Sequence, residues 1–225
     1  MSPLLTLRCI GILMGIGISL HAVTGGAQII GSGPSGACRS APSPSGGDVL
    51  PGKYYERQAQ DYLDREDTTS ALTAFQHAAY YGNKQAQYDL AMMYLKGAKK
   101  IPINAPLGIA WLRVATQYGE ATAIAALGKL EPALTEEQRE FSDRQFQKLV
   151  DRYGVATTRR RVMGTFQRAR GLAAFADWIC TDGEAMPSDT YVARINDEFA
   201  EYVTTMYGKV TVEPLQPVSG PGDKK

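Results

Sequence analysis

Excess charge, histidine and long hydrophobic runs are all scarce in this chain. Its 225 residues carry a formal net charge of +1 at pH 7 and include two histidines and three cysteines. Nucleic-acid binding depends on an excess of Lys and Arg that neutralises phosphates, so we expect no nucleic-acid partner. The apolar fraction of 44% is ordinary and is enough for a hydrophobic core in a chain of this length.

The amino-terminal apolar run is too short to cross a bilayer as a helix. Residues 1–27 have a positive start at Arg8, an apolar run from Cys9 to Leu20, and small residues up to Ala27. The run has about twelve residues, whereas a transmembrane helix needs roughly twenty. We interpret residues 1–27 as a signal peptide cleaved after Ala27, with Ala22 as the alternative site. A retained anchor is the less favoured alternative, so we expect an exported protein without a stable membrane span.

Export changes what the cysteines can do, because thiols pair in an oxidising compartment. Cys9 leaves with the signal peptide, which makes Cys38 and Cys180 a candidate intramolecular disulfide. Two unpaired thiols and pairing between chains are the alternatives. A lipoprotein anchor at Cys38 is disfavoured, because Ser35-Gly36-Ala37 lacks the usual large aliphatic residue.

The groups needed for catalysis are also few. His21 lies in the signal peptide, so any histidine chemistry would fall to His77, which we expect to face water. A hydrolase that pairs His77 with Cys38 or Cys180 needs a nucleophile in fixed geometry, and Cys38 lies in a segment predicted to be flexible. These residues lack the spacing of metal ligands, and no glycine-rich phosphate loop joins a strand to a helix. We therefore predict a non-enzymatic protein without metal or cofactor.

Composition divides the chain into segments. Residues 28–52 are rich in Gly, Ser and Pro and are predicted to form a flexible leader, and residues 209–225 a flexible tail. The sequence between them is helical in pattern. It falls into a repeat region, 53–131, and a carboxy-terminal helical region, 132–208.

The repeat region shows a period of 37 residues. The windows that begin at Ala71 and Gly108 align so that Gly82 matches Gly119 and Ala86 matches Ala123. Such a period is typical of stacked helical hairpins. Small residues let neighbouring helices approach, larger ones fill the spaces between them, and Gly82 and Gly119 end helices at positive φ. The residues predicted to pack the repeats are Phe75, Ala78, Gly82, Ala86, Leu90, Tyr94, Gly97, Trp111, Leu112, Ala115, Gly119, Ala123 and Leu127.

In these residues the chain resembles the Sel-one-like repeat family, relatives of the tetratricopeptide repeats. The family pattern of Ala, Leu-Gly, Tyr and Gly, then Trp, paired Ala and Gly, is held here from Ala86 to Gly119. The departures are Ala91, Asn104, Gly108 and Thr116, and the resemblance covers residues 54–131. It implies an all-α fold, a short α-α solenoid, and a scaffold of the periplasm or a secreted one that binds another protein.

The carboxy-terminal region is predicted to form three helices that cover the last repeat. Thr135 opens the first with a capping box. The second runs from Val162 towards Trp178 and Ile179, and the third follows a cap at Ser188 or Asp189 and ends at Gly208. A short extended piece is expected at 210–212.

Two surfaces are candidates for binding. Tyrosines at variable repeat positions could anchor a partner, although packing of helices is favoured for most of them: Tyr80, Tyr81 and Tyr88. A basic cluster is interpreted as a solvated helix face, with an anionic-ligand patch as the alternative: Arg159, Arg160, Arg161, Arg168 and Arg170.

The predicted function is an exported, non-enzymatic adaptor of the cell envelope that binds another protein. One alternative is an envelope-acting hydrolase with a site between Arg159 and Asp182. The other is a structural component that binds cell wall through the basic cluster.

Overall fold

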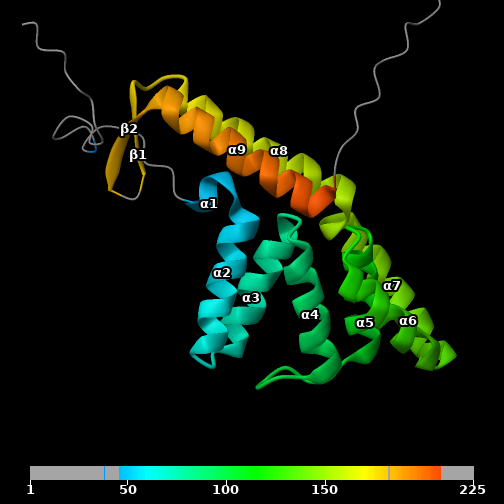
Figure 1. The fold of residues 1–225 in the computed structure, drawn as a ribbon. Helices are drawn as coiled ribbons and strands as arrows, with labels where there is room; N and C mark the ends of the chain where they lie inside the picture. Colours follow the sequence, from blue (N-terminus) through cyan, green and yellow to red (C-terminus); the bar gives the residue numbers. More distant parts are fainter. Residues whose placement is uncertain (1–37, 39–45, 182, 209–225) are drawn as a thin grey trace, which may run out of the picture. The chain divides into compact units, whose positions relative to one another are not determined.

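Helices make up most of the described chain, as the sequence predicts. The computed structural model describes Cys38, residues 46–181 and residues 183–208 (Figure 1). The predicted signal peptide 1–27, most of the predicted leader, the segment 210–212 and the predicted tail lie outside the described residues. The elements in chain order are α1 (Gly46–Val49), α2 (Pro51–Asp64), α3 (Thr68–Tyr80), α4 (Lys84–Lys96), α5 (Ala105–Thr116), α6 (Ala121–Leu130), a 3₁₀ turn η2 (Glu131–Ala133), α7 (Glu136–Tyr153), α8 (Val155–Ala173), β1 (Trp178–Thr181), β2 (Glu184–Pro187) and α9 (Ser188–Tyr207).

Local sequence signals set many of the helix ends. The Asn83 side chain accepts a hydrogen bond from the Ala86 amide at the start of α4, over 2.8 Å. Thr135 forms the predicted capping box with Gln138 at the start of α7. Gly82 follows the end of α3 and Gly119 follows the end of α5. Their φ angles of 75° and 68° place both in the left-handed region, as predicted.

Helices α2 to α7 share one hydrophobic core. Each of α2, α3 and α4 packs against the next helix, and α5 packs against both α6 and α7. Among the residues predicted to pack the repeats, Gly119 is exposed, while Tyr94, Gly97 and Leu127 are partly buried. The others are buried: Phe75, Ala78, Gly82, Ala86, Leu90, Trp111, Leu112, Ala115 and Ala123.

Helices α8 and α9 pack on each other around a second core. The rings of Phe166 and Phe199 stack at its centre, with centroids 3.9 Å apart. Of the three helices predicted to form a carboxy-terminal cap, only α7 packs on α5 in the first core, whereas α8 and α9 form a hairpin with a core of its own. Val49 and Leu50 are buried in this second core. The predicted leader is therefore helical at 46–49 and 51–52, and residues 49–52 are buried, because these two apolar side chains have a surface to cover.

The helix expected to run to Trp178 and Ile179 ends at Ala173 instead. Trp178–Thr181 forms strand β1 and pairs antiparallel with β2, so that Cys180 lies opposite Ala185. Aromatic and β-branched residues favour a strand here, and Gly183 adopts a φ of 83° between the strands.

The third predicted helix starts differently from the expected cap. Pro187 occupies the N-cap position, and neither Ser188 nor Asp189 caps α9 with its side chain. The Ser188 hydroxyl donates instead to the carbonyl of Ala176, and this bond ties the start of α9 to the segment after α8. Gly208 ends the helix with a φ of 77°, as predicted.

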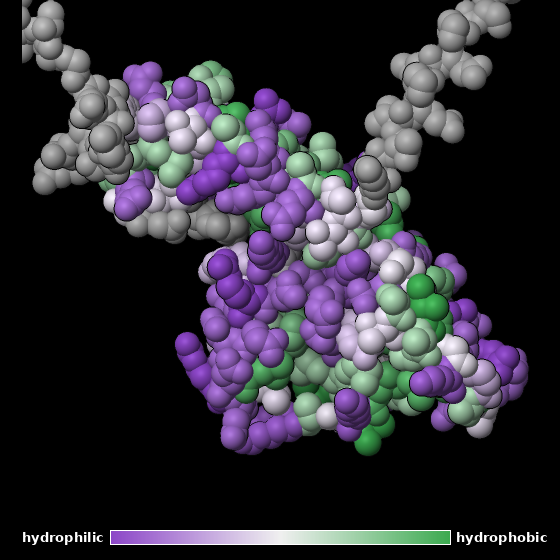
Figure 2. All heavy atoms as spheres, in the orientation of Figure 1, coloured by the Kyte–Doolittle hydropathy of each residue, from purple (hydrophilic) through white to green (hydrophobic). Residues whose placement is uncertain are grey.

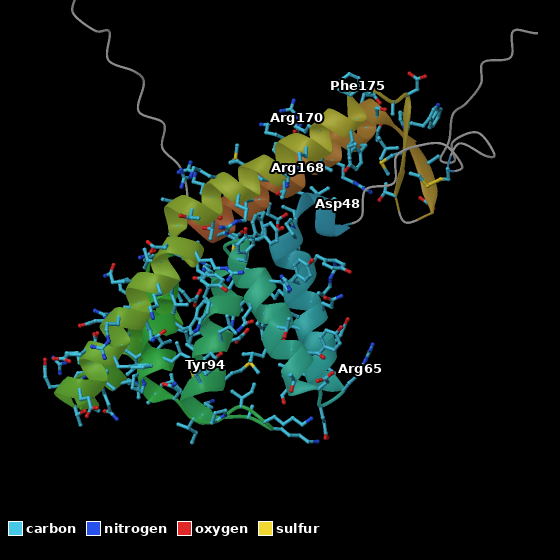
Figure 3. The ribbon with its side chains drawn as sticks, turned by 180° about the vertical axis from the view of Figure 1, so that it is seen from behind. Asp48, Arg65, Tyr94, Arg168, Arg170 and Phe175 are labelled. Atoms are coloured by element: carbon cyan, nitrogen blue, oxygen red, sulfur yellow. A yellow bond between two sulfur atoms is a disulfide. The ribbon has the colours of Figure 1, made fainter. Side chains whose placement is uncertain are left out.

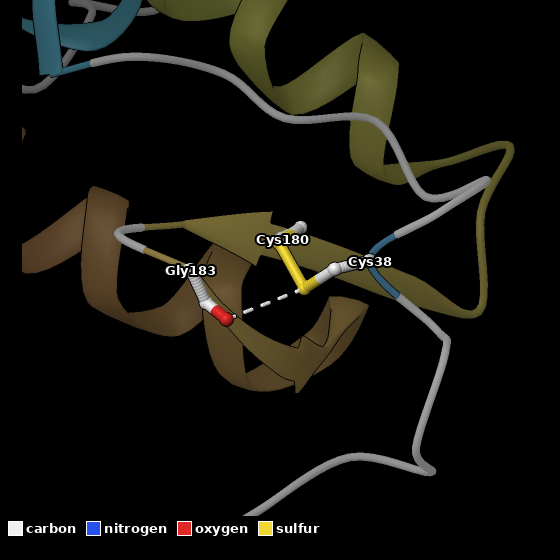
Figure 4. The surroundings of a disulfide bond; sticks show 3 residues. All are labelled: Cys38, Cys180 and Gly183. Carbon is white, nitrogen blue, oxygen red and sulfur yellow. Dashed lines mark hydrogen bonds between the residues drawn. A yellow bond between two sulfur atoms is a disulfide. The ribbon is translucent and has the colours of Figure 1, made fainter.

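A disulfide joins Cys38 to Cys180 on strand β1 (Figure 4). This is the intramolecular pair expected from the sequence, with the two cysteines 142 residues apart. The Cys38 sulfur lies 3.6 Å from the carbonyl oxygen of Gly183. The second core is therefore linked covalently to a residue that precedes every described helix.

A chain of buried hydroxyls connects the first core to α8. The hydroxyls of Tyr118 and Thr158 lie 2.5 Å apart, and Tyr118 donates to the carbonyl of Tyr153 over 2.8 Å. Tyr207 of α9 donates to Thr158 over 3.4 Å. The three hydroxyls can be arranged so that Tyr207 donates to Thr158, Thr158 to Tyr118, and Tyr118 to the Tyr153 carbonyl. The junction between the two cores is thus satisfied without an unpaired hydroxyl.

Replacing Thr158 with valine tests this junction. Thr158→Val keeps the side-chain shape but removes the donor to Tyr118 and the acceptor for Tyr207, so we expect a loss of about 1–3 kcal/mol in the free energy of unfolding. Urea denaturation followed by circular dichroism measures it. Thr157→Val, at a partly buried neighbour on α8, is the matched control, and an equal loss in both variants would contradict the assigned role.

Removing the disulfide should also destabilise the chain. The double variant Cys38→Ser/Cys180→Ser frees a long loop in the unfolded state, and we expect it to cost about 2–4 kcal/mol. Thermal denaturation with and without a reductant measures the effect. The reductant should lower the midpoint of the parent chain and leave that of the variant unchanged; a parent chain insensitive to reductant would contradict the prediction.

Candidate functional site

The carboxyl end of α3 meets α8 through an arginine that covers a tyrosine ring. The Arg161 Cζ lies 3.3 Å from the ring centroid of Tyr80, and Arg161 Nη1 donates to the carbonyl of Tyr80. The same guanidinium donates to the carbonyl of Arg152 over 3.3 Å. Arg161 therefore differs from the solvated cluster expected in the sequence analysis. The Arg161 side chain is partly buried because it donates to the Tyr80 carbonyl, at the last turn of α3, and lies over the face of the Tyr80 ring.

The tyrosines proposed as partner anchors make contacts within the chain. The carbonyl of Tyr81 accepts a hydrogen bond from the Tyr202 hydroxyl over 3.1 Å. The Tyr81 ring stacks on Tyr55 at 6.4 Å between centroids, and Tyr88 packs against the first core. Tyr80, Tyr81 and Tyr88 are all partly buried. Tyr80 and Tyr81 thus help to hold α8 and α9 against α3.

Next to this contact, a cavity of about 540 Å³ opens between α1, the end of α3 and α8. Phe175, just beyond α8, is 94% exposed, and Leu172 is 46% exposed. Figure 3 shows Arg168 on the side of α8 that faces α1, where Asp48 lies. The lining residues are Asp48, Tyr81, Thr165, Arg168, Ala169, Gly171, Leu172 and Phe175. The cavity therefore has an exposed aromatic ring at its edge and a cation at its wall.

The charge of α8 is entirely positive. The helix contains five arginines and no acidic residue. Among the residues that the structure describes, no ion pair is formed by four of these arginines, all exposed: Arg159, Arg160, Arg168 and Arg170. Hydrophilic side chains gather over α8 and α9 in Figure 2. This helix can therefore offer several cations to a bound anion.

The one titratable tyrosine in the cavity stays neutral. Burial raises the pKa of Tyr81 above its usual value, and the tyrosines Tyr55 and Tyr80 add to the shift. The positive charges of Arg161 and Arg168 offset part of this increase in the Tyr81 pKa. Tyr81 thus presents a phenol, which can donate and accept hydrogen bonds, rather than a phenolate.

The residues considered for hydrolysis are not arranged as a nucleophile and a base. Cys38 and Cys180 are bonded to each other, so neither presents a thiolate. His77 is exposed, as predicted, and stacks on Tyr55 with centroids 4.9 Å apart. Of the two acidic residues between positions 159 and 182, Asp177 is exposed and Asp182 lies outside the described residues.

The described residues contain neither a cluster of metal ligands nor a helix that could span a membrane. No group of three or more His, Cys, Asp or Glu side chains within them could hold a metal ion. Across the same part of the chain, every helix is too short or too polar to span a membrane.

A group of carboxylates lies across three helices of the first core. Burial raises the pKa of Asp89 on α4 to about 6, and the charges of Glu56 and Glu120 contribute to the shift. The Gln85 amide, which donates to Asp89 over 3.1 Å, opposes it. The folded chain therefore holds a proton on Asp89 more tightly than the unfolded chain does.

The sequence analysis missed Asp48, Leu172 and Phe175. Asp48 lies in the Gly- and Ser-rich stretch that predicts a leader, and Leu172 and Phe175 lie outside the apolar stripe that predicts the buried face of α8. A usable signal was present: Arg168, Leu172 and Phe175 are spaced along one helix face that excludes the buried Ala169 and Ala173. Apolar residues outside the buried stripe could have marked the site.

Substituting Asp89 with asparagine should make stability less dependent on pH. Because the folded pKa of Asp89, about 6, exceeds the ordinary aspartate pKa of 3.8, wild-type stability falls as pH rises between these values. Asp89→Asn removes the charge, so we expect it to be more stable than wild type at pH 7.5 and similar near pH 4. Urea midpoints across this range measure the difference. Asp61→Asn, at an exposed position of α2, is the control; a gain for Asp89→Asn that is the same at every pH would contradict the cause.

Comparisons of the chain with protein-family models, with curated proteins and with solved structures found no match.

Proposed function

We propose that this protein is an exported, non-enzymatic interaction scaffold whose binding surface is the cavity between α1, α3 and α8. The observation that carries the proposal is the exposed Phe175 ring beside that cavity. Phe175 and the exposed Leu172 both line this recess, and exposed apolar side chains that lie together mark interaction sites more often than single ones do. Aromatic residues next to a recess are also common anchors in protein interfaces.

The proposal treats residues 54–131 as Sel-one-like helical hairpins. Support comes from equivalent roles at positions one period apart. Ala78 and Ala115 are both fully buried, and Phe75 and Leu112 both lie in the first core. In this view α2 to α7 form a short α-α solenoid that holds α8 in place, and the tyrosines of the repeats serve the scaffold more than the partner.

Export is part of the same proposal. It rests on the signal-peptide pattern of residues 1–27 and on the pairing of Cys38 with Cys180, since disulfides persist mainly outside the cytosol. The cell envelope or the medium is therefore the proposed location of the protein and of its partner.

Binding of an anionic cell-wall polymer is a second candidate function. The observation in its favour is the set of exposed arginines on α8 without ion-pair partners among the described residues. It explains the charge but not the exposed Phe175 and Leu172, which a hydrated polymer would leave without a contact. The interaction scaffold therefore accounts for more of the surface.

Site-specific photo-crosslinking in cells tests the proposal. A benzoylphenylalanine at position 175 replaces one aromatic ring with another, and we expect it to yield a discrete protein adduct. Ile124 on α6, which is 52% exposed, and Tyr88 are the matched positions, and we expect little adduct from either.

Two outcomes would contradict the proposal. Adducts from position 88 but not from 175 would move the binding surface to the repeat face. Adducts from no position, in cells where the disulfide-bonded chain accumulates normally, would argue against a protein scaffold altogether.

A further inference from the structure

We infer that the cavity between α1, α3 and α8 binds an acidic peptide segment that carries one large apolar side chain. This inference rests on the proposed function and specifies the chemistry of the partner. Three features of the described residues lead to it: the spacing of residues on α8, the sign of their charge, and the concave form of the site.

The first feature is a stripe along α8. Arg168 and Leu172 are four residues apart, and Phe175 follows three residues later. Residues four apart lie on one face of a helix, and Phe175 lies in the turn directly after α8, where its amide bonds the carbonyl of Leu172 over 3.4 Å. All three residues line the cavity. A cation is thus followed along the same face by two exposed apolar side chains. A ligand that matches this order has an anion followed by an apolar anchor.

The second feature is charge complementarity. Arg168 is exposed and lines the cavity, and α8 offers no carboxylate to neutralise it. Asp48 on α1 is the acidic residue in the cavity lining. The carboxylates of a bound segment would therefore lie on the α8 side and avoid α1, which fixes the orientation of the peptide.

The third feature separates a peptide from a lipid surface. A cavity of about 540 Å³ is large enough for a bulky side chain and part of a backbone. A bilayer surface is broad and could contact the exposed Phe175 ring, but it would not fill a recess walled by Tyr81, Thr165 and Ala169. Anionic lipid therefore accounts for the arginines but not for the cavity.

Selection from a random peptide library on phage, using the disulfide-bonded secreted chain as bait, tests the inference. We expect the enriched peptides to combine Asp or Glu with one Phe, Trp, Leu or Met. Synthetic copies of these peptides should bind less tightly as salt is raised. Arg168→Glu and Phe175→Ala should each weaken their binding by about tenfold or more, as measured by fluorescence anisotropy.

Two matched variants control for charge and for apolar surface. Arg57→Glu reverses an exposed arginine on α2, and Ile124→Ala trims an exposed apolar residue on α6. Both should bind the enriched peptides as the parent chain does. Circular dichroism spectra and thermal midpoints of all four variants show whether each has folded.

The outcomes separate this inference from the proposed function. Enriched peptides that are basic or neutral, or that bind the folded Arg168→Glu variant unchanged, would overturn the acidic partner while leaving a peptide-binding scaffold. Absence of any enriched peptide would overturn both. Co-sedimentation with phosphatidylglycerol vesicles that Phe175→Ala abolishes, or Phe175-dependent self-association in sedimentation, would replace the peptide with a membrane or with a second copy.

Discussion

The packing of α8 and α9 against the helical hairpins depends on the Thr158 hydroxyl. It accepts a hydrogen bond from Tyr207 and shares one with the Tyr118 hydroxyl, and so connects α9 and α8 with the turn after α5 and, through Tyr118, with the end of α7. The group is fully buried, where an unpaired hydroxyl would be costly. Because Thr158 and Tyr118 also have the carbonyls of Tyr153, Gly154 and Val155 as acceptors, both hydroxyls are paired in this arrangement of the two cores. That arrangement also sets the positions of α1, α3 and α8 around the candidate cavity.

Two glycines make the same junction sterically feasible. A Cβ on Gly82 would collide with the Tyr207 hydroxyl, and a Cβ on Gly52 would collide with that of Tyr202. Gly82 thus has two reasons to be glycine: its positive φ ends α3, and its missing side chain lets α9 approach. The repeat pattern accounts for the first reason, while the second belongs to this chain's own carboxy-terminal hairpin.

The features that could be predicted from the sequence are those set by neighbouring residues. Gly82, the capping box at Thr135 and the stop at Gly208 depend on contacts within a few positions, and the structure has all three. The position of Arg161 depends on a tyrosine 81 residues away. Strand β1 has residues that favour a strand, but it also depends on pairing with β2 and on burial of Ile179 in the second core. The candidate cavity was missed for the same reason, since its walls come from segments far apart in sequence.

The position of the disulfide has a consequence for how the chain responds to cleavage. Cys38 lies before α1 and Cys180 lies after α8, so the covalent ring that they close contains helices α1 to α8. The residues that line the candidate cavity all lie within this ring, whereas α9 lies outside it. A protease that cuts one loop within this ring leaves both pieces attached through the sulfur bridge. A nicked molecule would keep its mass and much of its packing until it met a reductant. In the proposed extracytoplasmic location, this ring would delay the step from a first cut to dissociation.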